Sequence, residues 1–409
     1  MKNEYLIAQR LYYNPDAHRQ ARPAIRVALI GMTIGITVIL LTFAVVFGFK
    51  NAVTEKVTGF SGHIEVVNFD NNNTYQMQPV FASDSLLDRL KSIDGIERAN
   101  RFATKPVMKV AEDIHPIVIK GLPVNDRQAW TFFSRNIIRG QLPESKNEVI
   151  ISNAVAQLMH VDVDSTVLAY FIDDNIRARK LSVSGIYRTD LTEFDNLFVV
   201  GDLRQVQALN GWNEKQVSGI ELYVRDFNHL YEVSDNVYFA VANQADEDGN
   251  FFYTQNIEEL QPQIFYWLDL LDMNVVVIIV LMLIVSGFCI ISGLIILILE
   301  SIQFIGTMKA LGATNMFIRR VFLWQTAFLV SKGLVYGNVI ALAICLLQYY
   351  FHLIPLDAAT YYVSYVPISM SLSWWLLADV GVLAASMLIL LAPSAIVTKI
   401  SPAQVMRYE

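Results

Sequence analysis

Two stretches without a charged residue constrain this chain more than any other feature. Residues 27–49 form a run of 23 between Arg26 and Lys50, and residues 275–299 form a run of 25 that ends at Glu300. As an α-helix, each run would extend about 35 Å at about 1.5 Å per residue, which is enough to cross the roughly 30 Å core of a bilayer. Both runs are therefore predicted to be transmembrane helices.

Two further apolar runs have the length of a membrane span. Residues 321–351 are interrupted once by Lys332, and residues 372–397 are interrupted by Asp379 and Pro393. The first run of the chain is longer than the ~7–15-residue core of a signal peptide and has no small-x-small cleavage site after it, so it is expected to remain as an anchor. The sequence thus predicts an α-helical membrane protein with four transmembrane helices, at 27–49, 273–299, 321–351 and 372–397.

Basic residues are distributed unevenly over the segments outside these helices. Five of them precede the first helix and three lie in the 300–320 loop, whereas the 352–371 loop has none. The positive-inside rule then places the 1–26 segment, the 300–320 loop and the 398–409 tail in the cytoplasm. By the same rule, the segment 50–272 is expected outside.

The long external segment is predicted to be a separate α+β domain, with room for two subdomains. It carries 20 basic and 32 acidic residues, a net charge of −12 within a chain of net charge −7. This acidity argues against a nucleic-acid-binding face, which is normally basic. Its β-rich stretches, which predict strands, lie at 63–67, 107–110, 117–119, 148–151, 167–172, 181–186, 197–200 and 220–224. Short helices are predicted at 83–92, with Ser83 as the N-cap, at 154–159 and at 203–210.

The sequence contains no pattern that carries catalysis. The six histidines show no metal-ligand spacing, and there is neither a G-x-S-x-G elbow nor a G-x-x-x-x-G-K-[ST] phosphate loop. Cys289 and Cys345 lie inside apolar runs and are expected to be buried packing thiols. We therefore predict no catalytic or metal-ligating residue and no enzymatic activity. If ATP is used, another chain must bind it.

The 300–320 loop, ESIQFIGTMKALGATNMFIRR, is predicted to contain a short helix. Ile302, Ile305, Met308 and Leu311 recur at near-helical spacing, and Gly312 stands where a glycine would end such a helix. A helix of this kind is either a connector that lies along the membrane surface or a docking element for a cytosolic partner. The periodicity alone favours neither.

This loop resembles the coupling-helix motif of the MacB/FtsX-type ABC-transporter permeases, roughly E-R-x-x-E-I-G-x-L-K-A-L-G-A. The matching residues are Glu300, Ile305, Gly306, Lys309, Ala310, Leu311, Gly312 and Ala313. Gln303 replaces the usual acid and Ser301 the usual arginine, which removes one possible salt bridge to an ATPase. The end of the chain, from Pro402 and Ala403 to Arg407, Tyr408 and Glu409, resembles the C-terminal motif of the same family.

Other residues are similar to the lipoprotein-releasing (Lol) branch of these permeases. They are Gly48, Phe49, Gly59, His63 and Ile64 after the first helix, the segment 139–150, and Tyr361, Tyr362, Val363, Val366 and Pro367 before the fourth helix. The resemblance covers the whole chain in order. It implies the type VII ABC permease architecture, with a MacB-like external domain between helices one and two. It also implies a location in the inner membrane of a Gram-negative-type bacterium.

The resemblance further implies a function and a set of partners. A cytosolic ABC ATPase dimer, which holds ATP and Mg²⁺, would dock on Glu300, Gln303, Ile305, Gly306, Lys309, Ala310, Leu311 and Gly312. The chain itself would bind no cofactor and would pair with a second copy or a paralogue. Together they would use ATP-driven motion, or mechanotransmission, to extract an acylated lipoprotein from the inner membrane toward the outer membrane. The alternatives are a same-fold efflux or export permease and a cell-division-type permease that activates a periplasmic hydrolase.

In the same family context, several residues acquire expected roles. The apolar cavity that receives the acyl chains would be lined by Val45, Val46, Phe49, Leu268, Leu271 and Val275, unless these face lipid or a partner helix. Lol permeases that recruit a periplasmic carrier have a long hairpin, whereas residues 170–180 predict a short one that turns at 173–175. In the membrane, Lys332 is expected to snorkel, to face a protein interface or to act as a coupling charge. Asp379 is expected to reach water, and Gly333 and Gly337 to permit close helix packing.

Overall fold

The computed structural model describes residues 2–13, 22–71, 75–110, 114–172, 176–394 of the chain. These residues divide into two compact units. One, the helical unit, contains the described residues up to Lys50, those from Leu268 to Pro355 and those from Val366 onward. The other, the α/β unit, consists of Asn51–Trp267 and Leu356–Tyr365.

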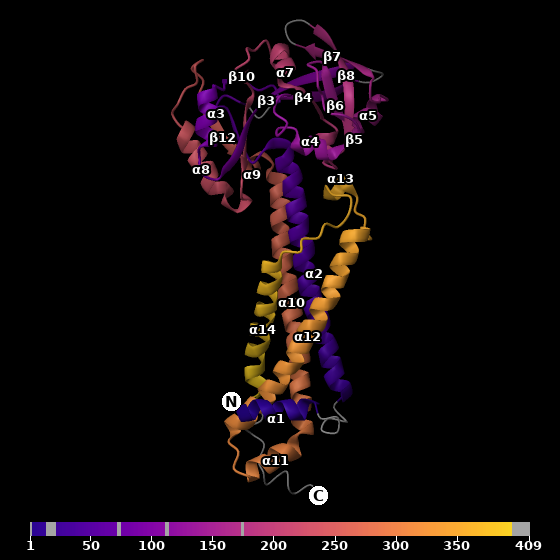
Figure 1. Cartoon of the computed structure of the whole chain (residues 1–409), viewed down its shortest axis with the longest axis vertical. Helices are drawn as coiled ribbons and strands as arrows, with labels where there is room; N and C mark the ends of the chain where they lie inside the picture. Colours follow the sequence, from indigo (N-terminus) through magenta and orange to yellow (C-terminus); the bar gives the residue numbers. More distant parts are fainter. Residues whose placement is uncertain (1, 14–21, 72–74, 111–113, 173–175, 395–409) are drawn as a thin grey trace. The chain divides into compact units, whose positions relative to one another are not determined.

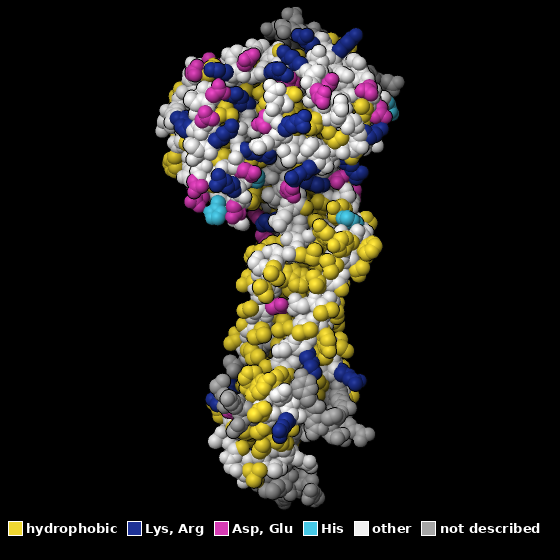
Figure 2. Space-filling model, viewed as in Figure 1, with side chains coloured by type: hydrophobic (Ala, Val, Ile, Leu, Met, Phe, Trp, Pro, Cys, Tyr) yellow, Lys and Arg dark blue, Asp and Glu magenta, His cyan; other side chains and the backbone are white. Residues whose placement is uncertain are grey.

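Four helices are long and apolar enough to cross a membrane (Figure 1). They are α2 (Arg22–Ser61), α10 (Pro262–Glu300), α12 (Asn315–Phe351) and α14 (Leu372–Ser394). Two shorter helices, α1 (Lys2–Tyr13) and α11 (Ile302–Ala310), complete the helical unit. Figure 2 shows hydrophobic side chains across much of the visible surface of this unit, as expected for helices that face lipid.

Helix α2 is longer than the uncharged run that predicts it. It continues beyond Phe49 because Val53, Val57 and Phe60, at i, i+4 and i+7, bury one apolar face. The sequence prediction ended this helix at Phe49, before the charge of Lys50. A charged residue limits how far a helix can be buried in lipid, but it does not end the helix itself. Helix α10 likewise begins at Pro262, before its own uncharged run.

Glycines allow α2 to approach two neighbouring helices closely. A Cβ atom at Gly35 would clash with Ser286 of α10, and one at Gly337 of α12 would lie 2.7 Å from Ile36 Cγ2 of α2. Gly333 lies one turn earlier and is buried on the same face of α12. The predicted close packing at Gly333 and Gly337 is therefore confirmed, and the partner is α2.

Two charged residues and two cysteines lie within the apolar runs of these helices, and they differ in burial and in hydrogen bonding. Asp379 of α14 does not rely on water alone, because Asn338 Nδ2 of α12 donates a hydrogen bond to its Oδ1 at 2.9 Å. The expectation that Asp379 reaches water stays a prediction, and its partner Asn338, 41 positions away, is invisible to local spacing. Lys332 is half-buried, and its role stays a prediction. Cys345 is buried and Cys289 half-buried, and both are free thiols.

The α/β unit is built on a ten-stranded mixed sheet of order β12-β1-β11-β3-β4-β9-β6-β8-β5, with β7 paired to β3 and β8. The strands are β1 (Ile64–Asn68), β3 (Ile96–Val110), β4 (Ile114–Leu122), β5 (Ile137–Gly140), β6 (Glu148–Ser152), β7 (Thr166–Ile172), β8 (Ile176–Tyr187), β9 (Phe198–Asp202), β11 (Gly219–Val224) and β12 (Phe252–Asn256). The long strand β3 pairs with β11 through its first half and with β4 through its second half. It thereby joins both halves of residues 51–267 into one compact unit.

Short helices connect and cover the strands of this sheet. They are α3 (Asp84–Lys91), α4 (Thr131–Asn136), α5 (Asn153–Met159), α6 (Thr192–Asp195), α7 (Leu203–Asn210), η1 (Phe227–His229), α8 (Leu230–Val241), α9 (Ile257–Leu260) and α13 (Ala358–Tyr361), with a small second sheet of β2 (Val80–Phe81) and β10 (Gln216–Val217). All eight predicted strands and the three predicted helices are present, and Ser83 caps α3 through a hydrogen bond from Leu86 N. Strands β5 and β12 and helix α8 were not predicted, because their sequences lack a clear apolar alternation or cap.

The predicted short hairpin is formed by β7 and β8. The two strands pair from Thr166 opposite Ser182 to Ile172 opposite Ile176. The predicted turn at 173–175 lies outside the described residues.

Candidate functional site

Helix α11 ends at a glycine, as its sequence predicts. Gly312 has a φ of 91°, in the left-handed region that favours glycine. Its N–H donates to Lys309 O at 3.0 Å, and Ala313 N–H donates to Met308 O at 2.9 Å. These two bonds form a Schellman motif, which stops the helix sharply before Thr314 caps the next one.

The predicted coupling residues divide between two faces of this connection. Ile305 and Gly306 are buried, and Ile305 belongs to the core of the helical unit. Gln303, Ala310, Leu311 and Gly312 are exposed, whereas Glu300 and Lys309 are half-buried. The outward face is therefore available to another molecule, while the inward face fixes α11 to the membrane helices.

Leu311, which helical spacing groups with Ile302, Ile305 and Met308, differs from the buried Ile305 in its exposure. Its side chain is 78% exposed, because Leu311 is the C-cap residue and no longer follows the helical repeat. An exposed leucine beside a rigid glycine turn is a small apolar contact point. The expected role of Leu311 as an ATPase contact stays a prediction.

The six residues predicted to line an acyl cavity lie on two helices of the helical unit. Val45, Val46 and Phe49 belong to α2, and Leu268, Leu271 and Val275 to α10. Phe49, Leu268 and Val275 are buried, and the other three are half-buried. In this conformation the set is packed, so an acyl chain could reach Leu268, which is 0% exposed, only if neighbouring elements moved apart.

An ion pair joins α2 to α10 beside these residues. Lys50 Nζ lies 2.8 Å from Asp272 Oδ2 and 3.5 Å from Asp269 Oδ1. Lys50 is the charge that ends the first uncharged run, and the sequence did not identify its partners. The pair is partly exposed and contributes little to stability by itself, but it fixes how the two helices are paired here.

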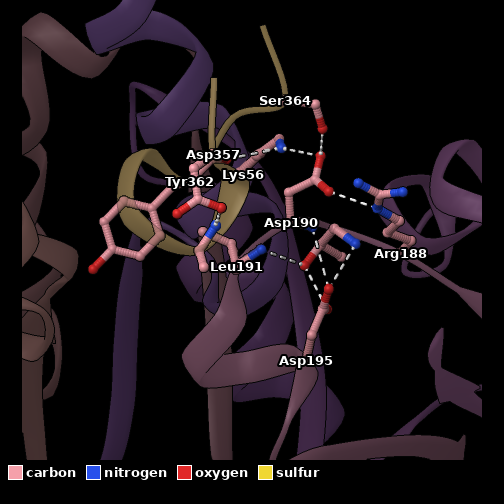
Figure 3. Close-up of polar contacts among 10 residues, drawn as sticks. Lys56, Arg188, Asp190, Leu191, Asp195, Asp357, Tyr362 and Ser364 are labelled. Carbon is pink, nitrogen blue, oxygen red and sulfur yellow. Dashed lines mark hydrogen bonds and ion pairs between the residues drawn. The ribbon is translucent and has the colours of Figure 1, made fainter. Parts of the chain in front are cut away.

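The loop Leu356–Tyr365 is attached to the rest of the α/β unit by a half-buried carboxylate, that of Asp190, which the sequence did not single out (Figure 3). Asp190 Oδ2 accepts a hydrogen bond from Ser364 Oγ at 2.7 Å and lies 3.3 Å from Lys56 Nζ. Arg188 Nε binds the other oxygen at 2.7 Å. Burial alone would raise the pKa of Asp190, but these three donors outweigh it and lower the pKa.

A second aspartate holds Asp190 in position. Asp195 Oδ2 accepts the backbone N–H groups of Thr189 at 3.1 Å and Asp190 at 3.2 Å, while its Oδ1 accepts the Thr189 hydroxyl at 2.7 Å. These bonds fix a tight turn in which Asp190 has a φ of 63°. The carboxylate is therefore preorganised to meet the loop (Figure 3).

Tyr362 completes the attachment from the loop side. Its carbonyl oxygen accepts a hydrogen bond from Lys56 Nζ at 2.9 Å, and its ring meets Trp267 edge-on at 6.0 Å between centroids. Tyr362 has a φ of 60°, which turns the loop sharply after α13. The Tyr361–Val363 motif was a usable sequence signal for this site, whereas nothing local distinguished Asp190.

The described residues contain no group of three or more His, Cys, Asp or Glu side chains that could hold a metal ion. The site instead consists of two connecting segments. One is α11 with its glycine turn, which has an exposed outer face, and the other is the loop Leu356–Tyr365, which polar contacts hold to distant residues. The fold defines the class of protein: a chain with four helices long and apolar enough to cross a membrane, and with a large α/β domain between the first two of them.

Comparison with known proteins identifies the family. Residues 27–249, more than half of the chain, match the family model of the MacB-like periplasmic core domain, and residues 276–402 match that of the FtsX-like permease C-terminal region. The chain belongs to the MacB/FtsX family of ABC-transporter permeases.

Similar proteins include members of the Lol system. The lipoprotein-releasing system transmembrane protein LolC of Xylella fastidiosa is 20% identical, with 93% of each chain covered, and LolE of Haemophilus influenzae is 22% identical, with 92% of each covered. Among solved structures, the periplasmic region of MacB from Actinobacillus actinomycetemcomitans is 10% identical with a TM-score of 0.33, and covers 50% of this chain and 92% of its own.

Proposed function

We propose that this chain is the membrane subunit of a lipoprotein-releasing ABC transporter in the inner membrane. It would couple ATP hydrolysis by a separate ATPase to the extraction of an acylated protein toward the outer membrane. The similarity to Lol permeases, which extends over nine tenths of the chain, supports this assignment. The proposal includes the type VII architecture, with both termini and α11 in the cytoplasm.

The observation that carries the proposal is the geometry of α11. A short helix with a buried inner face and an exposed outer face, closed by a Schellman turn, connects two membrane helices directly. Such an element passes a push on its outer face to α10 and α12, because its inner residue Ile305 is packed in the core they share. A cytosolic ABC ATPase dimer, which binds ATP and Mg²⁺, is the partner that would supply the push.

The substrate would be bound by the helical unit. Each CH₂ group taken from the bilayer costs about 0.8 kcal/mol, so extracting two or three acyl chains costs tens of kcal/mol unless an apolar surface receives them. Val45, Val46, Phe49, Leu268, Leu271 and Val275 are the candidates for that surface. Their packed state supports a cycle in which ATP-driven motion exposes them and then closes them again.

The proposal requires further partners. A second copy of the chain or a paralogue would supply the other half of the transporter. Membrane subunits of this kind would pair about a two-fold or pseudo-two-fold axis, which needs two subunits. A periplasmic carrier would receive the lipoprotein. The short β7–β8 hairpin argues against docking of this carrier on the present chain.

The proposal is tested by purifying the chain from its native membrane together with its partners. We expect an ATPase with a phosphate-binding loop and an acylated protein in the complex, and release of that protein from reconstituted vesicles only when ATP is hydrolysed. An ATPase partner without a bound acylated protein, and without ATP-dependent release, would contradict the lipoprotein assignment and leave only the family membership.

A further inference from the structure

A cavity of about 250 Å³ lies inside the α/β unit, where α2 ends. Its walls include the rings of Phe60, Phe102, Phe194 and Phe198. All four are buried, and the ring centroid of Phe60 lies 4.7 Å from that of Phe194 and 4.8 Å from that of Phe198. Because an apolar cavity of about 150 Å³ can bind benzene, this space can hold an aromatic ring with a short arm.

Two side chains in the wall of the cavity have polar atoms without a hydrogen bond to the described residues: Asn71, through its Nδ2, and Glu65. The Glu65 side chain lines the cavity, is only 6% exposed, and makes no hydrogen bond among the described residues. A buried carboxyl group without a hydrogen bond is costly and uncommon in a folded protein. Because the carboxyl group of Glu65 faces the cavity, its partner there is a proton, water or a bound ligand.

The charges around Glu65 do not balance. Glu65 of β1 lies directly opposite Glu221 of β11, and Lys120 Nζ pairs with Glu221 at 2.5 Å and also donates to the carbonyl of Phe60. Two buried carboxylates thus share one ammonium group, which is already committed to one of them. Burial and the charge of Glu221 raise the pKa of Glu65 to about 8, with Lys120 acting in the opposite direction.

The other titratable groups near Glu65 do not supply the missing charge. Tyr223 of β11 is buried, and burial raises its pKa well above the usual value, so it is neutral. Glu259 of α9 also lines the cavity and adds a third carboxylate. Lys120 also lines the cavity but is paired with Glu221, so the carboxyl groups of Glu65 and Glu259 are the charges left to attract a cation.

We propose that this cavity binds a small organic cation, a primary amine with an apolar body. The ammonium group replaces the proton on Glu65, which is released to solvent, and the apolar body packs against the phenylalanine rings. The electron-rich faces of aromatic rings attract cations, which adds to the attraction of the carboxylate. This binding site goes beyond the proposed function and depends on neither the ATPase nor a lipoprotein.

The proposal is tested with phenethylamine and its neutral analogue 2-phenylethanol, titrated calorimetrically into the purified full-length chain in detergent. We expect the amine to bind with release of one proton, and its affinity to rise about tenfold per pH unit between pH 6 and pH 8, because ligand and proton compete for Glu65. The alcohol should not bind measurably.

Two variants make the test specific. Glu65→Gln should reduce amine affinity at pH 8 at least tenfold, and it should fold normally, because glutamine imitates the protonated acid. Heat that remains when the amine is titrated into Glu65→Gln in the same detergent reports partition of the amine into micelles. Glu97→Gln, at an exposed glutamate of β3 outside the cavity, should bind the amine like the unchanged protein.

Three results would overturn the proposal. The first is absence of amine binding to a chain that retains its unfolding transition. The second is equal binding of amine and alcohol, which would identify an unselective apolar cavity. The third is amine binding that Glu65→Gln leaves unchanged.

Discussion

The hydroxyl of Ser364 donates a hydrogen bond of 2.7 Å to the carboxylate of Asp190, which is 174 positions earlier in the sequence. This contact ties the loop between α12 and α14 to the α/β unit, and Lys56 at the end of α2 joins the same carboxylate. The carboxylate of Asp190 therefore holds together the loop Leu356–Tyr365 and the end of α2 within the α/β unit.

Removing the charge of Asp190 should loosen this loop. In Asp190→Asn, Lys56 loses its ion-pair partner and Arg188 its acceptor charge, which should cost about 1–3 kcal/mol locally. We expect faster amide hydrogen exchange in Leu356–Tyr365, with the remaining sheet unchanged. The matched control is Asp162→Asn, which breaks the exposed pair with Arg139 and should change little. Unchanged exchange in the loop would contradict the role of Asp190.

Adding one methyl group at Gly48 should destabilise the helical unit. A Cβ atom there would lie 2.6 Å from Pro367 O and 2.7 Å from Ser369 N, both of which are backbone atoms that cannot rotate away. We expect Gly48→Ala to cost about 1–3 kcal/mol and to lower the thermal unfolding temperature in detergent. Gly381→Ala is the control, because nothing lies within 4 Å of its Cβ position. Equal unfolding temperatures for both variants would refute the close approach.

A charge at Leu311 should weaken binding of the proposed ATPase without affecting the fold. Because the Leu311 side chain is 78% exposed, Leu311→Glu should leave the unfolding temperature unchanged and reduce ATPase co-purification at least tenfold. Met316→Glu, at another exposed apolar position of the same connection, controls for added charge. Co-purification equal to that of the unchanged protein would count against α11 as the docking element.

A charge at Val46 should reduce release of the proposed lipoprotein. Val46 is half-buried on α2, among the residues proposed to receive the acyl chains, and a carboxylate there would repel an apolar ligand. We expect Val46→Asp to slow ATP-dependent release at least tenfold in reconstituted vesicles at equal protein levels. Val380→Asp on the exposed side of α14 is the control for placing a charge in the membrane. Lipoprotein release by Val46→Asp at the rate of the unchanged protein would exclude this surface as the one that receives the acyl chains.

The stability of the α/β unit should fall as the pH rises toward 8. The pKa of Glu65 is raised from 4.5 to about 8 by burial and by Glu221, so the folded state holds a proton that the unfolded state has lost. The contribution of the protonated Glu65 to the free energy of unfolding is fully present below pH 4.5. Between pH 4.5 and about pH 8 the free energy of unfolding falls by about 1 kcal/mol per pH unit. We expect the unfolding temperature to decrease from pH 6.5 to pH 8, and Glu65→Gln to remove most of this decrease.

The contribution of His63 to stability depends on pH in the opposite direction, and it sets the lowest pH at which the Glu65 experiment can be interpreted. Burial and the charge of Arg98 lower its pKa from 6.5 to about 4, so the unfolded state binds a proton that the folded state does not. Its contribution is present above pH 6.5 and is lost as the pH falls toward 4. Measurements above pH 6.5 therefore isolate Glu65. A slope that persists in Glu65→Gln would mean that another group controls it.

Much of the architecture could be predicted from the sequence, because hydrophobicity and helix caps are local properties. The uncharged runs predicted the membrane helices, and Gly312 predicted the end of α11, where the positive φ needs a residue without a Cβ atom. Prediction was weaker where folding depends on tertiary burial. Helix α2 extends to Ser61 through buried Val53 and Val57, which lie beyond the first charge that ended the predicted helix.

By itself, the sequence determined the number of apolar helices, eight of the ten strands in the main sheet of an acidic α/β domain, three of its helices, and the motif of the connecting segment. Only the tertiary structure decided which residues meet. Ser364 with Asp190, Asn338 with Asp379, and Glu65 with Glu221 are contacts between positions far apart in the chain. The physical reason is that a hydrogen bond or a shared charge depends on distances in space, which strand order and helix packing set and which no local pattern encodes.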